Sequence, residues 1–157
     1  MIKINVVAVG RVKEKYFQEG VLEYLKRLSK YASVKIIEVK EETFLQGDNP
    51  LERQRLIDKE GEEIIRNLRG KVIALCIEGE KKSSEKFAAD IKRRVDCGEE
   101  LTFVIGGSYG LSKKVKDLAD SKISFSDMTF PHTLARLILV EQIYRAFTII
   151  NNATYHK

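Results

Sequence analysis

Residues 101–119 read LTFVIGGSYGLSKKVKDLA, an apolar run followed by a glycine-rich turn and a short polar segment. The continuous apolar run predicts a buried strand over Leu101–Ile105, and the spacing after the turn predicts a short helix over Lys113–Ala119. Three of the five residues from 106 to 110 are glycine. A strand, a tight turn and a helix in this order are half of a βαβ unit, so the stretch indicates an α/β protein.

The same alternation extends in both directions from this stretch. The other expected strands are Ile2–Val9, Val34–Val39, Val72–Ile77 and Ile123–Phe125. The other expected helices are Glu14–Tyr31, Leu51–Leu68, a helix capped by Ser83 or Ser84 that runs to about Val95, and Pro131–Ile150. The order predicts a mostly parallel sheet with helices on both faces, formed by a single domain over residues 1–157. Ligands of such sheets bind beyond the carboxyl ends of the strands.

Composition and cysteine usage narrow the class of protein. The chain is 43% hydrophobic and 32% charged, which is typical of a globular protein. No apolar run reaches the roughly 18–20 residues of a membrane span, and the N-terminal run is short and ends at Gly10 without a cleavage site. Cys76 and Cys97 form no metal or redox motif. We therefore expect a cytoplasmic protein with no membrane segment and no metal site.

Positive charge is concentrated at the N-terminus. Residues 1–35 contain eight Lys or Arg and three Glu, which accounts for the whole net charge of +5. The rest of the chain is neutral. Such a segment is either a solvated helix face with surplus lysines or a surface that attracts a polyanion such as RNA.

Three loops follow strands and are candidates for a ligand site. They are 78–84, with the sequence EGEKKSS, 106–110, with GGSYG, and 126–132, with SDMTFPH. The glycines of 106–110 allow a backbone to approach a ligand closely, but GGxxG is neither the GxGxxG fingerprint nor a Walker A loop. Each loop has a plain reading as a βα turn or a helix entry beside its reading as a ligand loop.

The last expected helix is apolar nearly all round, so it should be buried on most sides or in a partner. Its polar interruptions are His132, Arg136, Glu141, Gln142 and Arg145. Glu141 and Arg145 are spaced for an ion pair, and each arginine could serve a structural pair or a phosphate. The C-terminal Tyr155-His156-Lys157 is either a frayed tail or an aromatic and basic group that stacks on a base.

Five blocks in one order carry a family resemblance. They are VAVG at 7–10, DKEGE at 58–62, VIGGSYGLS at 104–112, the run from FSDMTFPH at 125–132 to EQIYRA at 141–146, and YHK at 155–157. Together they resemble the ribosomal RNA large subunit methyltransferase H family, small enzymes of the SPOUT class that act on a pseudouridine of 23S rRNA. The resemblance spans the whole chain. Cys76 and Lys81-Lys82 depart mildly from the family pattern beside the expected pocket.

The resemblance implies a trefoil-knotted α/β fold, a homodimer and S-adenosyl-L-methionine as the cofactor. Its cofactor contacts carry over to Leu75, Gly107, Ser126, Asp127, Met128, Thr129, Phe130 and Pro131. The implied partner is 23S rRNA in the assembled ribosome. The implied product is N3-methylpseudouridine in helix 69.

The hypothesis for catalysis is direct displacement, in which the N3 proton leaves and the nitrogen attacks the activated methyl in line. The residues expected to hold the base and its phosphates are His132, Arg136, Tyr155 and His156, with His156 as a candidate proton acceptor. The main alternative is a non-catalytic RNA-binding or ribosome-binding module of the same fold. A SPOUT enzyme acting on tRNA and a monomeric flavodoxin-like nucleotide binder are further alternatives.

Overall fold

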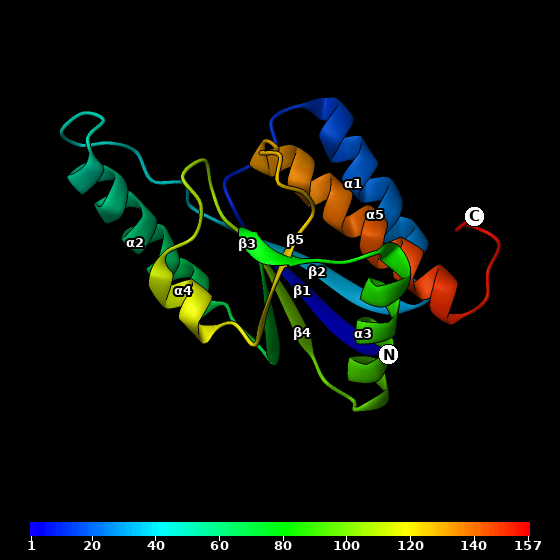
Figure 1. Cartoon of the computed structure of the whole chain (residues 1–157). Helices are drawn as coiled ribbons and strands as arrows, with labels where there is room; N and C mark the ends of the chain where they lie inside the picture. Colours follow the sequence, from blue (N-terminus) through cyan, green and yellow to red (C-terminus); the bar gives the residue numbers. More distant parts are fainter.

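The computed structural model describes residues 1–157 and contains one sheet in the order β2-β1-β4-β3-β5 (Figure 1). The strands are β1 (Ile2–Val9), β2 (Ala32–Val39), β3 (Lys71–Lys81), β4 (Leu101–Ile105) and β5 (Ser121–Ser124). The helices are α1 (Lys15–Leu28), α2 (Pro50–Arg66), α3 (Ser84–Asp96), α4 (Lys113–Leu118) and α5 (His132–Ile150). Every neighbouring pair of strands is parallel, which confirms the predicted α/β class.

Helices cover both faces of the sheet. Helices α1, α3 and α5 pack together on one face, and α2 and α4 lie on the other (Figure 1). Side chains of β1 alternate between the two cores: Ile4 and Val6 point to the first, Val7 and Val9 to the second. Because β1 is buried on both faces, it appears in the sequence as one continuous apolar run.

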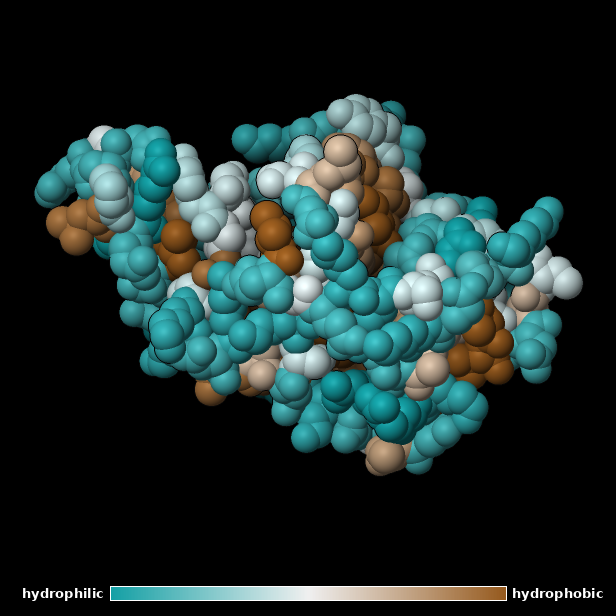
Figure 2. Space-filling model, viewed as in Figure 1, coloured by the Kyte–Doolittle hydropathy of each residue, from teal (hydrophilic) through white to brown (hydrophobic).

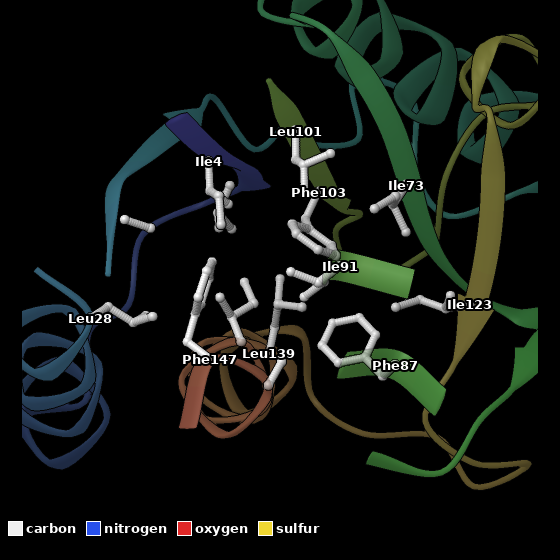
Figure 3. Packing of buried hydrophobic residues seen from close by; sticks show 14 of the residues in the cluster. Ile4, Leu28, Ile73, Phe87, Ile91, Leu101, Phe103, Ile123, Leu139 and Phe147 are labelled. Atoms are coloured by element: carbon white, nitrogen blue, oxygen red, sulfur yellow. The ribbon is translucent and has the colours of Figure 1, made fainter. Parts of the chain in front are cut away.

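The larger core lies between the sheet and the α1, α3 and α5 layer. In Figure 3, Phe147 and Leu139 of α5 and Leu28 of α1 converge beneath Ile4 and Phe103. Burying one such side chain stabilises the fold by about 1.5–3 kcal/mol. Helix α5 is therefore an integral part of the core, as its apolar composition predicted.

Side-chain caps fix the starts of three helices. Asn49 Oδ1 accepts the amide of Glu52 at 2.9 Å to begin α2, and Ser83 Oγ accepts the amide of Lys86 at 3.1 Å to begin α3. Ser112 caps α4 in the same way. Each cap contributes about 1 kcal/mol. Ser83, one of the two expected caps, is thus the residue that begins α3.

Strand β3 extends beyond the predicted end at Ile77. After an irregularity, Glu80 and Lys81 pair with β5, so residues 78–81 are strand and the prediction of a turn there was wrong. Gly79 permits this pairing, since a Cβ at that position would lie 2.4 Å from the backbone carbon of Ile123. Other differences from the predicted bounds are smaller. Helix α1, for example, ends at Leu28 because the next strand begins earlier than predicted, at Ala32.

None of the helices combines the length and the apolar character that crossing a membrane requires. The longest, α5, carries the ion pair of Glu141 and Arg145 at 2.5 Å, as its spacing predicted.

Candidate cofactor and RNA site

A cleft of about 980 Å³ opens at the carboxyl ends of the strands. Its walls come from the segments that follow β1, β4 and β5 and from the middle of β3. Figure 2 shows the surface hollowed between the lobe over α2 and the lobe over α1 and α5. This is the edge at which open parallel sheets bind ligands.

The cleft gathers almost all of the residues that the family resemblance assigned to the cofactor. It is lined by Leu75, Gly107, Ser126, Met128, Thr129, Phe130 and Pro131. Asp127 is the exception: its side chain is 80% exposed and its carboxylate pairs with Lys81 Nζ at 2.6 Å. The loops after β4 and β5, far apart in sequence, therefore form one site with Leu75 of β3.

The turn after β4 is packed so tightly that it requires glycine. A Cβ at Gly106 would lie 2.8 Å from the backbone carbon of Gly110. At Gly107 a Cβ would lie 3.0 Å from Val9 Cγ1 and 3.2 Å from Glu60 Oε1. A side chain at Gly107 would therefore crowd the side chains of Val9 and Glu60 behind the turn.

Local hydrogen bonds shape the loop after β5. Ser124 Oγ donates to the carbonyl of Ser126 at 3.0 Å, and the amide of Met128 donates to Ser126 Oγ at 3.0 Å. The Met128 side chain remains 73% exposed. The loop leads into α5 at Pro131, and no side chain caps this helix. The start of α5 lines the cleft. A helix start carries partial positive charge.

His132 is the one predicted catalytic residue that lines the cleft. Its Nε2 and the Oε2 of Glu41 flank Gly10, at 3.4 and 3.3 Å from the position a Cβ would take there. Arg11 and Lys13 line the same rim, so part of the basic N-terminal segment faces the cleft.

Arg136 lies behind the cleft and not on its surface. It is buried, with Nη1 donating to Glu38 Oε2 at 2.6 Å and Nη2 donating to the carbonyl of Gly10 at 3.0 Å. Its Nε has no partner. These contacts correspond to the structural ion pair that the sequence left open, and they tie α5 to the ends of β1 and β2.

Tyr155 packs against the C-terminal half of α5 and does not line the cleft. Its hydroxyl donates to Glu141 Oε1 at 3.1 Å and lies 3.2 Å from that of Tyr24. Burial, the Tyr24 hydrogen bond and the Glu141 carboxylate all raise the pKa of Tyr155, so its phenol stays protonated. The tail is therefore packed on the helix.

His156 is held equally firmly. Its Nδ1 lies 3.1 Å from Nη1 of Arg145, and its Nε2 lies 2.7 Å from Glu85 Oε1. Arginine is only a donor, so a ring that accepts at Nδ1 and donates from Nε2 satisfies both partners. Neither His156 nor Tyr155 lines the cleft.

Glu60 is a buried titratable residue behind the glycine turn, and its environment did not follow from the block 58–62 that contains it. It is 2% exposed, accepts the amide of Glu42 at 3.0 Å through Oε2, and has no partner for Oε1. Burial, with the carboxylates of Glu41 and Glu42 nearby, raises the pKa of Glu60 to about 7. The signal was present: Glu60 lies on the buried stripe of α2 between Leu56 and Ile64.

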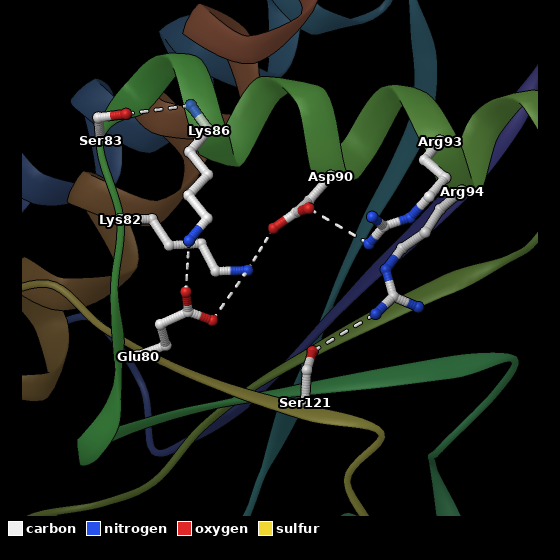
Figure 4. Close-up of polar contacts among 8 residues, drawn as sticks. All are labelled: Glu80, Lys82, Ser83, Lys86, Asp90, Arg93, Arg94 and Ser121. Carbon is white, nitrogen blue, oxygen red and sulfur yellow. Dashed lines mark hydrogen bonds and ion pairs between the residues drawn. The ribbon is translucent and has the colours of Figure 1, made fainter.

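The departures from the family pattern have separate environments. Cys76 lines the cleft, and burial raises the pKa of its thiol. Lys82 points away from the cleft into a polar network with Glu80 and Asp90, which joins the end of β3 to α3 (Figure 4).

The fold and this cleft can be compared with known proteins. The model of the family described as "Predicted SPOUT methyltransferase" matches residues 2–156. The solved structure of a methylase-family protein from Haemophilus influenzae superposes with a TM-score of 0.57 at 13% identity, over 100% of this chain and 72% of that one. A methylase-family protein from Neisseria gonorrhoeae gives 0.54 at 10% identity, over 99% and 87%. Together the family model and the cleft define a SPOUT-class protein.

Curated relatives refine this class. Ribosomal RNA large subunit methyltransferase H of Carboxydothermus hydrogenoformans is 50% identical, over 99% of this chain and 100% of that protein. The protein of the same name from Streptococcus gordonii is 48% identical with the same coverage. The chain belongs to the ribosomal RNA large subunit methyltransferase H family. Membership also implies the trefoil knot that the resemblance predicted.

Proposed function

We propose that this protein transfers a methyl group from S-adenosyl-L-methionine to N3 of a pseudouridine in helix 69 of 23S rRNA, on the assembled ribosome. The observation that carries the proposal is the convergence of Leu75, Gly107 and the loop after β5 on one cleft. The names of the relatives at 46–50% identity support the large-subunit rRNA as the substrate.

The residues of the cleft fit this cofactor. Its volume of about 980 Å³ is at the upper end of small-molecule sites, which leaves room for a cofactor and a nucleobase together. Leu75 and Met128 offer apolar surface to an adenine, and the Gly107 backbone can approach it closely. When bound, the cofactor supplies an activated methyl group, so the protein has chiefly to position the acceptor.

The rim of the cleft provides groups for the RNA. Arg11 and Lys13 place positive charge where a phosphate would pass. His132, at the start of α5, is the imidazole placed to hold the base or take its N3 proton. Arg136 would act through the segments it fastens, because its guanidinium is occupied by Glu38 and by the backbone.

Tyr155 and His156 would reach a cleft only as part of a second copy of the chain. A homodimer supplies such a copy. The flank of α5 that carries Leu134, Leu137 and Ile138 is incompletely buried and apolar, which suits a contact between subunits. In this arrangement the partner's tail would contribute the aromatic and basic groups for the substrate base.

Calorimetric titration with S-adenosyl-L-methionine, with the mass in solution recorded alongside, tests the cofactor site. We expect the wild type to bind as a dimer. Gly107→Ala should lower the affinity about tenfold, because the added Cβ crowds Val9 and Glu60 and shifts the turn that lines the cleft.

Gly98→Ala is the matched control. Gly98 has φ +71° and open space around it, so alanine strains the backbone far from the cleft. It should lower the melting temperature without changing the affinity for the cofactor. A monomeric wild type without cofactor binding would favour the non-catalytic RNA-binding module.

A further inference from the structure

An aromatic and cationic cluster stands at the edge of the cleft, and the proposed cofactor and catalytic roles do not use it. Tyr109 of the glycine turn lies 5.4 Å, centroid to centroid, from Phe44 of the loop between β2 and α2. The guanidinium carbon of Arg53 on α2 lies 5.2 Å from the centre of the Tyr109 ring. Tyr109 nevertheless remains 40% exposed and lines the cleft.

The segment that carries Phe44 is fixed on both sides of this residue. The carbonyl of Thr43 accepts from Nη2 of Arg55 at 2.8 Å, and the amide of Leu45 donates to Glu52 Oε2 at 3.0 Å. Glu52 is itself buried, with 8% of its surface exposed. The aromatic pair therefore stands on a backbone that is ordered before any ligand arrives.

Tyr109 is fixed as well. It lies between Ser108 and Gly110 in a turn that the amide of Gly110 closes by donating to the carbonyl of Gly107 at 3.1 Å. Gly110 has φ +85°, a conformation that glycine adopts without strain. The turn thus holds the Tyr109 ring at the rim, while the backbone of Gly107 lines the cleft.

The position of the cluster suits a long substrate. Helix α2, with Arg53, and helix α5, which begins at His132, lie on opposite faces of the sheet (Figure 1). Tyr109 and His132 both line the cleft, so they mark opposite sides of its opening. A nucleotide strand that places one base in the cleft must pass a neighbouring base across one of these sides.

We propose that Tyr109, Phe44 and Arg53 form a stacking platform for an unpaired nucleotide next to the methylated one in the RNA substrate. An exposed tyrosine ring backed by a second ring and a guanidinium is the chemistry that holds single-stranded bases. Arg53 already pairs with Asp48 at 2.5 Å, which orients its plane and leaves stacking as its main contribution. The proposal rests on RNA being the substrate.

Steady-state methyl transfer to ribosomes that lack the modification tests the platform in the full-length protein. Stacking of one base on an aromatic side chain is worth about 1–3 kcal/mol, so Tyr109→Leu should raise the KM for ribosomes about tenfold and leave kcat within about twofold. Tyr109→Phe keeps the ring and should behave as the wild type. Leu118→Ala, at an apolar residue of α4 that is 50% exposed, is the control and should also behave as the wild type.

A second measurement does not need catalysis. A single-stranded RNA oligonucleotide with 2-aminopurine should lose fluorescence on binding the wild type and Tyr109→Phe, because the base stacks on the ring, and should keep it with Tyr109→Leu. If the wild type quenches the probe but transfers no methyl group, the proposed methyl transfer fails, while the stacking of an unpaired base on Tyr109 stands.

If methyl transfer occurs but Tyr109→Leu keeps the wild-type KM and quenching, the platform is refuted. It is refuted equally if Tyr109→Leu changes the affinity for S-adenosyl-L-methionine or the mass in solution enough to account for the loss, since Tyr109 would then be a structural residue.

Discussion

The buried carboxyl of Glu60 makes the stability of this protein depend on pH in a predictable direction. Its pKa is about 7 in the folded protein against an ordinary value of 4.5. Between these two values the folded state holds a proton that the unfolded state has released, so stability falls as the pH rises through this range and is constant above it. The full difference corresponds to about 3 kcal/mol.

Glu60→Gln removes this titration but keeps an oxygen that can accept the amide of Glu42. We expect the free energy of unfolding of the variant, relative to wild type, to increase by about 2–3 kcal/mol between about pH 5 and pH 8. The chain has no tryptophan, so urea unfolding would be followed by circular dichroism at one protein concentration and without cofactor.

Glu62→Gln is the control on the same helix, because Glu62 is exposed. Its difference from wild type should not change with pH. If Glu60→Gln also kept a constant difference from wild type across this range, the assignment of an uncompensated buried carboxyl would be refuted.

Two further substitutions test how the C-terminal half is held. Gly79→Ala places a Cβ 2.4 Å from the backbone of Ile123 and should cost about 3 kcal/mol or more in urea unfolding; a cost under about 1 kcal/mol would show that β3 and β5 separate easily. Arg136→Met removes the partner of Glu38 and a donor to a buried carbonyl, and should lower the free energy of unfolding by about 2–4 kcal/mol. Equal stability of Arg136→Met and wild type would instead favour a role for this arginine in RNA binding.

Much of the fold could be predicted from the sequence because strands and helices alternate strictly. Leu101–Ile105 has the predicted bounds because an apolar run buried on both faces ends at a glycine turn. The end of β3 could not be predicted from the sequence. Residues 78–81 are polar and contain a glycine, and they become strand only through pairing with β5. Such pairing between distant segments leaves no local signal.

The residues of the candidate site also fall into those that could be assigned from the sequence and those that could not. Leu75, Gly107 and Pro131 could be assigned through the family resemblance, and the structure brings them together. The positions of Tyr155 and His156 could not be predicted, because hydrogen bonds to Glu141 and Glu85 fix the tail and neither bond follows from sequence spacing. Tertiary contacts of this kind override the default of a frayed terminus.

Methyl transfer to RNA is the central claim, and labelled S-adenosyl-L-methionine tests it directly. Purified protein would be incubated with the labelled cofactor and ribosomes that lack the modification, and the modified nucleoside would be mapped by mass spectrometry. We expect label in 23S rRNA as N3-methylpseudouridine in helix 69. Cofactor binding without any label in ribosomal RNA, or label found in tRNA, would contradict it.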